Sequence, residues 1–381
     1  MAGGYGINFV VRAEFVTVTG NSAEMSVKST FVLMFAALAA LAAPGFGETR
    51  VSGVIDRETR WKAEDGPFIV EGDILITRRG NLFIAPGTRI IIKNSDTKNA
   101  DIPQFDRADS GLISFRVQGS MSCVGRRNNP IVFEPERSEH IGFTWRGIIL
   151  DAADAPNVEI AFTEVSGATT ALTIRNTSAL IRNCAFENSN IGIHAVHGGA
   201  PRIHNNLIAS CFTAGIKVER SNPQIVNNII AFNSNLGLWC DNNSRITFRH
   251  NSVFGNTDGD FLDCEPTFGK LTRAVKDRDS TDHYGNIIAD PVFVGSPAEA
   301  RAIELDVSLQ TDSARVRNTR LLNIPNLQFG TPPRKVPTVL GSEGRQLSVK
   351  YSPCVNAGDP GGAFRNVDGS RNTIGPSGGP D

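Results

Sequence analysis

Residues 215–233, Gly-Ile-Lys-Val-Glu-Arg-Ser-Asn-Pro-Gln-Ile-Val-Asn-Asn-Ile-Ile-Ala-Phe-Asn, contain the pattern that decides the fold. The pattern occurs one repeat earlier, as Gly-Ile-His-Ala-Val at 192–196 and Pro-Arg-Ile-His-Asn-Asn-Leu-Ile at 201–208, and one repeat later at 237–253. Ile203, Ile225 and Phe248 are equivalent positions, which gives steps of 22 and 23 residues. A repeat of this length indicates a solenoid, because each unit buries its apolar side chains only against its neighbours.

Each repeat has the periodicity of short strands. Ile216 and Val218 alternate with Lys217 and Glu219, and two further short runs follow at 224–226 and 229–231. This alternation is typical of strands and not of helices. Three short strands per ~22 residues predict one coil of a parallel β-helix. At ~4.8 Å per stacked strand, about ten coils are expected, with a length of roughly 45–50 Å.

Asparagines recur at one turn of the repeat. Asn206, Asn228 and Asn251 occupy equivalent positions, while Cys184 and Thr163 occupy this position in earlier repeats. Asparagine tolerates left-handed backbone, and its amide bonds to the next coil. We therefore expect a partial asparagine ladder with a structural role and no chemistry.

These repeats resemble the pectin-lyase-like superfamily of right-handed, single-stranded parallel β-helices over most of residues 50–290. Residues 82–92 (Leu-Phe-Ile-Ala-Pro-Gly-Thr-Arg-Ile-Ile-Ile) and 352–360 (Ser-Pro-Cys-Val-Asn-Ala-Gly-Asp-Pro) also fit exported members. The resemblance implies an all-β fold. It implies no single activity, because this scaffold carries lyases, hydrolases, adhesins and other proteins.

The chain divides into six segments. An apolar run from Phe31 to Ala43 follows a basic start at Met25, which predicts a signal peptide over 25–47 and a mis-assigned start over 1–24. Residues 48–110 are expected to begin and cap the helix, 111–295 to form its body, 296–346 to be an insertion and 347–381 to close it. The protein is then secreted, periplasmic or attached to a bacterial cell surface, and does not span the membrane.

Composition excludes some partners. Lys+Arg number 38 and Asp+Glu 39, so the chain lacks the positive charge that nucleic acid binding needs. Six cysteines are present without a Cys-x-x-Cys pair, so no zinc or other metal site is predicted. Cys184 and Cys240 fall at inward-facing positions and are expected to pack, whereas Cys264 and Cys354 are candidates for a disulfide.

The first strand of each coil presents two outward rows in the predicted register. One row holds Ile149, Thr173, His194, Lys217 and Trp239, and the other holds Asp151, Arg175, Val196, Glu219 and Asp241. An aromatic ring beside polar groups suits a sugar, because the ring stacks on the sugar and the polar groups meet its hydroxyls. The candidate substrate-binding residues are Trp239, His194, Lys217, Glu219 and Asp241. A polar solenoid surface with one exposed tryptophan explains the same residues without a ligand.

An enzyme is the alternative. A polysaccharide lyase needs a base, for which Lys217 and Arg175 are candidates. It often needs calcium as well, for which Asp151, Glu219 and Asp241 are candidate ligands, although Asp151 lies several coils from the other two; no other cofactor is suggested. Residues 256–260 (Asn-Thr-Asp-Gly-Asp) resemble a polygalacturonase motif, but the family's later acid pair, Gly-His-Gly and Arg-Ile-Lys are missing. Three hypotheses remain: a non-catalytic protein that binds polysaccharide or another envelope component, a lyase or hydrolase acting on an acidic glycan, and a purely structural surface protein.

Overall fold

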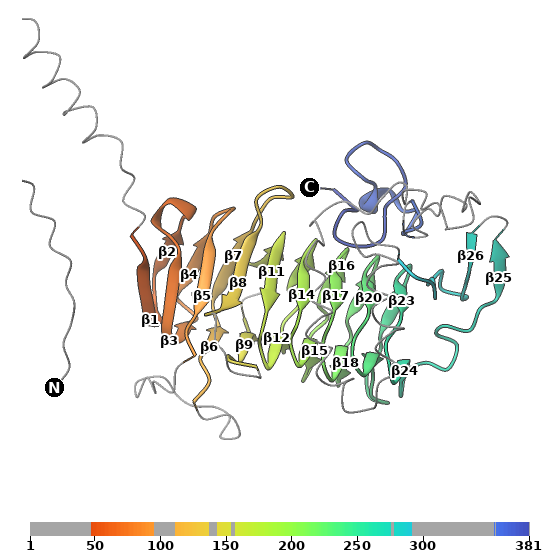
Figure 1. The fold of residues 1–381 in the computed structure, drawn as a ribbon, viewed down its shortest axis with the longest axis horizontal. Helices are drawn as coiled ribbons and strands as arrows, with labels where there is room; N and C mark the ends of the chain where they lie inside the picture. The colour runs from red at the N-terminus through yellow and green to blue at the C-terminus, as the bar shows by residue number, and fades with distance from the viewer. Residues whose placement is uncertain are drawn as a thin grey trace, which may run out of the picture. The chain divides into compact units, whose positions relative to one another are not determined.

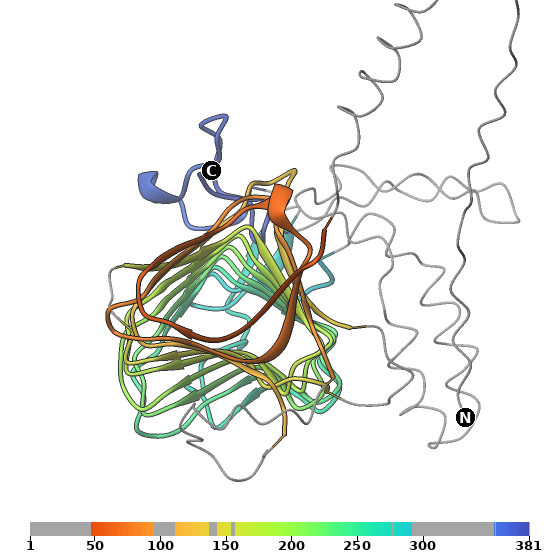
Figure 2. The ribbon, with the colours of Figure 1, turned by 90° about the vertical axis from the view of Figure 1, so that its left-hand side faces the viewer.

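The computed structural model describes residues 47–94, 111–136, 143–153, 157–275, 278–291, 354 and 356–380. Strands dominate these residues, and each strand of the solenoid pairs in parallel with the equivalent strands of neighbouring coils. The chain is a right-handed parallel β-helix, which confirms the predicted fold class. Figure 1 shows the coils following one another along one axis, and Figure 2 shows them superposed when seen along it.

Three faces surround the interior. Face A consists of β6 (Ser114–Val117), β9 (Gly147–Asp151), β12 (Thr170–Arg175), β15 (Ile191–Val196), β18 (Ala214–Glu219), β21 (Leu236–Trp239) and β24 (Gly259–Leu262). Face B consists of β2 (Glu58–Trp61), β4 (Asn81–Ile84), β7 (Ser120–Val124), β10 (Val158–Ala161), β13 (Leu180–Arg182), β16 (Arg202–His204), β19 (Gln224–Val226) and β22 (Thr247–Arg249). Face C consists of β5 (Arg89–Ile92), β8 (Ile131–Pro135), β11 (Thr163–Ser166), β14 (Ala185–Glu187), β17 (Leu207–Ala209), β20 (Ile229–Ala231) and β23 (Ser252–Phe254).

The number of coils is smaller than expected. Face B has eight strands in the described part of the chain, so the prediction of about ten coils was wrong. One long strand, β3 (Phe68–Ile76), pairs with β5 on face C and with β6 on face A, and β1 (Thr49–Ile55) pairs with β3. At the other end, β25 (Arg273–Val275) and β26 (Arg278–Thr281) form an antiparallel pair and add no coil. The last strand of face A in the described residues is therefore β24.

The interior is filled by columns of apolar side chains. Ile160, Ile181, Ile203, Ile225 and Phe248 stand in register along face B, and each is at most 2% exposed. Burial of one such side chain contributes about 1.5–3 kcal/mol. Since a side chain in one coil covers its neighbour in the next, the interior is dry only when the coils are stacked.

A single residue makes the turn from face B to face C. This residue has left-handed backbone, as in Asn183, Asn205 and Asn227 with φ of 52°, 55° and 61°. The next residue points inward. There the backbone N–H and side-chain Nδ2 of Asn206 both donate to Asn228 Oδ1, at 2.9 and 3.0 Å, and Asn228 donates likewise to Asn251 Oδ1 at 2.9 and 3.1 Å.

The asparagine column extends further than the sequence suggests. Asn251 donates to Asn286 Oδ1 at 2.9 and 3.1 Å, and Ser252 bridges to Ile287, so residues 286–287 begin another coil. A second column at the turn from face C to face A joins Asn233 to Asn256 at 2.8 Å, which the sequence analysis missed. Asn256 therefore has a structural role at a turn, where its Nδ2 also donates to Asp260 at 2.7 Å.

The C-terminal segment (residues 356–380) lies along the outside of the coils and does not continue them (Figure 1). Asn183 Nδ2 donates to the carbonyl of Gly378 at 2.7 Å, and Asn227 Oδ1 accepts from the backbone of Asp359 at 2.7 Å. Arg249 pairs with the Asp359 carboxylate at 2.9 Å. Asn183 and Asn227, which make the turn from face B to face C, therefore hold the C-terminal segment against the solenoid.

Part of the outer surface of face C is apolar and covered. Leu207 and Ile229 point outward but are 2% exposed, and they form a second apolar cluster with Ile287, Cys354 and Ile374. The runs Leu-Ile-Ala and Ile-Ile-Ala at 207–209 and 229–231 lack a polar residue because both sides of the strand are buried.

The disulfide prediction was wrong. Cys264 is bonded to Cys240, with their Cα atoms 5.0 Å apart, and not to Cys354, which is buried in the outer cluster. Cys184 is fully buried, as its inward position predicts. The chain passes from Cys240 to Cys264 in one coil, which brings their backbones together at the end of face A.

Several predictions lie outside the described residues. These are the mis-assigned start, the signal peptide up to residue 46, residues 95–110 of the segment expected to begin and cap the helix, and the insertion at 296–346. Strands β1 to β5 lie between residues 49 and 92. Among the described residues there is no helix with the length and apolar character that crossing a membrane requires.

Candidate functional site

Face A carries the two outward rows in the order that the sequence predicts. Strand pairing aligns Thr173 with His194, His194 with Lys217 and Lys217 with Trp239. In the second row it aligns Arg175 with both Asp151 and Val196, and Val196 with Glu219. Neighbouring strands in a sheet lie about 4.8 Å apart, so side chains from three consecutive coils are brought together on one surface.

Four of the five predicted binding residues are in direct contact. Glu219 accepts from His194 Nε2 at 2.8 Å through one oxygen, and pairs with Lys217 Nζ at 2.9 Å through the other. The same ammonium lies 4.1 Å from the centroid of the Trp239 ring. We call these four residues, His194, Lys217, Glu219 and Trp239, the face A strip. Lys217 therefore contacts both the acidic and the aromatic member of the strip.

The charges of the strip are largely compensated. Burial is the main reason that the pKa of His194 is lowered; the hydrogen bond to Glu219 opposes this and does not overcome it. Burial acts to raise the pKa of Glu219, but the hydrogen bonds from Lys217 and His194 outweigh it and the pKa is lowered. At neutral pH the strip therefore holds a neutral imidazole, a carboxylate and an ammonium beside an indole.

Asp241 and Arg175 are placed differently. The Asp241 carboxylate accepts from the backbone N–H of Arg220 at 2.9 Å and from the Ser244 hydroxyl, so it stabilises the turn after β21. Arg175 lies in the second row between Asp151 and Val196, and its charge contributes to the lowered pKa of His194. Neither residue contacts the strip through a described hydrogen bond.

Exposure along the two rows is uneven. Arg116, Ile149, Thr173 and Val196 are between 4% and 9% exposed, whereas the side chain of Glu219 is 37% exposed. The side chain of Asp151, whose carboxylate is 3.5 Å from Arg116, is 18% exposed, similar to His194 at 19% and Lys217 at 17%. Within the face A strip, Glu219 is therefore more accessible to a ligand than His194 and Lys217.

The asparagines at 206, 228 and 251 are fully buried and bonded to one another, which leaves them no access to a ligand. The carboxylates near residues 256–260 form no acid pair. Burial raises the pKa of Asp260, which accepts from Asn256, and Asp258 is exposed. The resemblance of this stretch to a polygalacturonase motif reflects its turn.

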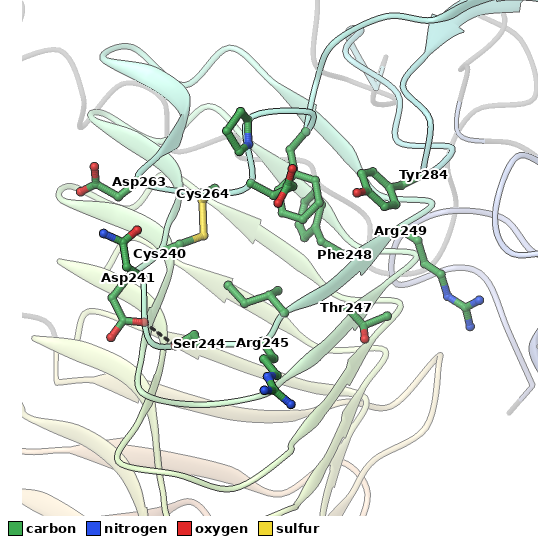
Figure 3. Close-up of a pocket in the computed structure, with 15 residues that line it drawn as sticks. Cys240, Asp241, Ser244, Arg245, Thr247, Phe248, Arg249, Asp263, Cys264 and Tyr284 are labelled. Atoms are coloured by element: carbon green, nitrogen blue, oxygen red, sulfur yellow. Dashed lines mark hydrogen bonds between the residues drawn. A yellow bond between two sulfur atoms is a disulfide. The ribbon is translucent and has the colours of Figure 1, made fainter.

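A pocket that the sequence analysis missed lies beside the last coil (Figure 3). It has a volume of about 550 Å³ and is lined by the disulfide Cys240–Cys264, the segment from Asp241 to Arg249, residues 263–268 and Tyr284. Phe268 and Tyr284 come from outside the repeat, and only the break in the period after residue 263 could have drawn attention to them.

No group of three or more His, Cys, Asp or Glu side chains arranged to hold a metal ion occurs among the described residues. Of the three candidate calcium ligands, Glu219 bonds to His194 and Lys217, Asp241 bonds to the backbone of Arg220, and Asp151 lies 3.5 Å from Arg116.

The match to one family model agrees with the fold. Residues 139–266 match the family model of the right-handed β-helix region. Among solved structures, a point mutant of the periplasmic alginate epimerase AlgG is similar, with a TM-score of 0.28 and 16% identity over 57% of this chain and 65% of that chain. The alignment therefore spans slightly less than two thirds of the epimerase. No curated protein sequence matches the chain.

Proposed function

We propose that the chain binds polysaccharide through the face A strip. The observation that carries this proposal is the contact of Lys217 with both Trp239 and Glu219, at 4.1 Å from the ring centroid and 2.9 Å from the carboxylate. Trp239 is partly exposed, and the exposed part of an indole is a surface on which a sugar ring can stack. Lys217 and Glu219 stand on the adjacent strand β18, where sugar hydroxyls find a donor in the ammonium and an acceptor in the carboxylate.

The strip suits an extended ligand better than a compact one. Its members come from β15, β18 and β21, so they follow the axis of the solenoid across three coils. A polysaccharide lying along this axis would meet successive coils with successive sugar residues. The open surface also favours a polymer, because small molecules usually need a concave site.

Binding is tested by affinity gel electrophoresis on a panel of neutral and acidic polysaccharides. Trp239→Ala is expected to weaken retardation about tenfold in Kd, the loss of one stacked aromatic ring. Gln224→Ala is the control, because Gln224 is exposed on face B away from the strip. Equal retardation of Trp239→Ala and the unmodified protein would refute the proposal.

A second candidate is acid–base catalysis on an acidic glycan. The observation that favours it is the 2.8 Å bond between His194 Nε2 and Glu219, together with the lowered pKa of the imidazole. If Nε2 donates to the carboxylate, Nδ1 carries the free lone pair and can abstract a proton. Lys217 would then stabilise the negative charge that develops on the substrate.

Product analysis separates the two candidates. A lyase releases unsaturated ends from polygalacturonate or alginate, and His194→Gln would abolish this release. A binder retains polysaccharide without cleaving it. Absence of both binding and cleavage across the panel would leave the purely structural hypothesis, in which stacking of the coils is the whole role.

We also propose that the protein works outside the cytoplasm. The Cys240–Cys264 bond supports this, because disulfides persist in oxidising compartments. The apolar run from Phe31 to Ala43 supports it independently. Fractionation of producing cells, with the mature N-terminus determined by mass spectrometry, tests the proposal; recovery of an uncleaved protein from the cytoplasm would refute it.

A further inference from the structure

The pocket beside the last coil has the dimensions of a ligand site. Its volume of about 550 Å³ lies within the roughly 300–1,000 Å³ of small-molecule sites. It opens between the turn that follows β21 and the loop that follows β24, and Tyr284 closes one side (Figure 3). Figure 3 shows the Tyr284 ring and the disulfide at opposite sides of this opening.

Aromatic rings form one wall of the pocket. The rings of Phe248 and Phe268 lie 5.1 Å apart, and those of Phe268 and Tyr284 lie 5.2 Å apart at 79°. Phe248 and Phe268 are buried, whereas Tyr284 is 36% exposed and its hydroxyl is held by Thr267 at 3.3 Å. The wall therefore presents a supported, accessible tyrosine ring to the opening.

The rim of the pocket is formed by polar side chains whose hydrogen-bond donors or acceptors are not all used by described residues. The backbone N–H of Arg245 donates to Asn222, but its guanidinium takes part in no hydrogen bond or ion pair among the described residues. The side chains of Asn242 and Asp263 are likewise exposed without a described partner. Glu265 retains one carboxylate oxygen after accepting from Thr267.

The aromatic wall and the polar rim together indicate which class of ligand fits the pocket. Acidic and basic side chains both surround the aromatic wall, so the pocket favours neither an anion nor a cation. Among the described residues there is also no cluster of three side chains that could hold a metal ion. A neutral ring that carries hydroxyls satisfies both parts, because its apolar face stacks on Tyr284 while its hydroxyls meet the rim. We propose that this pocket binds a neutral sugar residue.

The position of the pocket relates it to the face A strip. Trp239 is followed directly by Cys240 and Asp241, and both of these line the pocket. The pocket therefore begins where the face A strip ends. In this inference the pocket is a subsite for a glycan that lies on the strip, so the inference rests on the proposed function. The disulfide joins the two loops that flank the opening, which preorganises the subsite.

Two variants test the pocket. Arg245→Ala removes an exposed side chain without a described bond, so folding is unaffected, and Tyr284→Ala removes the aromatic wall. Arg202→Ala is the matched control, because Arg202 is exposed on face B two coils earlier. The probes are cellohexaose, mannohexaose and chitohexaose, titrated into the full-length protein by calorimetry.

We expect at least one hexasaccharide to bind, with Kd raised roughly tenfold in Arg245→Ala and Tyr284→Ala and unchanged in Arg202→Ala. Unchanged Kd in both pocket variants overturns the inference. If polysaccharide is retained through Trp239 but no hexasaccharide binds, the pocket inference is overturned and the proposed function stands. If neither polysaccharide nor hexasaccharide binds, both are overturned.

Discussion

Acid should weaken the fold through one histidine under the C-terminal segment. His204 ends β16, its ring lies 5.3 Å from that of Phe364, and its Nε2 has no hydrogen-bond partner among the described residues. Burial lowers its pKa to about 4, Arg202 and Arg249 add to the lowering, and Asp359 opposes it. The native state therefore holds this imidazole neutral where an unfolded chain protonates it.

The difference in protonation of His204 between the unfolded and the native state sets the size and the sign of the change in stability with pH. Between pH 6.5 and about 4 the unfolded state binds one proton more than the native state at this site, so stability rises with pH in that window. Each pH unit of this window changes the free energy of unfolding by about 1.36 kcal/mol. Acidification across the whole window should therefore remove roughly 3 kcal/mol of stability through His204.

Chemical unfolding at a series of pH values between 7 and 4.5 measures this dependence. His204→Gln should reduce the slope by about one proton. A residual slope is expected, because burial also lowers the pKa of His194 and His250. His283→Gln is the control, since His283 is exposed, and should keep the full slope. An unchanged slope in His204→Gln would refute the assignment.

Three further perturbations test other parts of the fold. Asn228→Ala leaves buried partners in two coils unpaired and should cost about 2–4 kcal/mol in chemical unfolding, while exposed Asn242→Ala should be neutral. Cys264→Ser should abolish the disulfide and cost about 3 kcal/mol, whereas Cys354→Ser should keep it; mass spectrometry with and without reductant decides between the two pairings. A chain ending at residue 353 should expose the apolar outer surface of face C and bind a hydrophobic dye; an unchanged dye signal would contradict this coverage.

The fold was predictable because the repeat specifies it locally. Ile181, Ile203 and Ile225 recur at one spacing, and this spacing is the strand register that the structure contains. The number of coils was not predictable, since β3 occupies places on two faces at one end and the β25–β26 pair departs at the other. A periodic pattern describes the middle of a solenoid and says little about its ends.

The disulfide shows where alignment by repeat fails. Leu238 pairs with Phe261 and Trp239 with Leu262, so Cys240 stands opposite residue 263 and not opposite Cys264. The cysteines are one residue out of register, which hides the pairing in an aligned sequence. The chain leaves β24 after Leu262, and the Cα atoms of Cys240 and Cys264 are 5.0 Å apart.

The candidate site was predictable in part for the same reason. Alternation within a strand gives the side on which Lys217 and Trp239 lie, and the repeat gives their neighbours. The backbone hydrogen bond from His250 to Tyr284 and the ion pair of Asp359 with Arg249 join residues outside the repeat to residues inside it. No periodicity encodes such contacts, so the pocket and the contacts of the C-terminal segment with the coils could not be predicted from the repeat, although a closing segment at 347–381 was expected.

The C-terminal segment has a consequence for cooperativity. A stack of coils that touch only their neighbours would fray from its ends, one coil at a time. Residues 356–380 instead bond to several coils at once, and Arg127 donates to the carbonyl of Ser377 across 250 residues of sequence. These contacts raise the contact order and slow the final stage of folding. The middle coils reach their full set of hydrogen bonds only after this later-synthesised segment has docked, and they should then melt together.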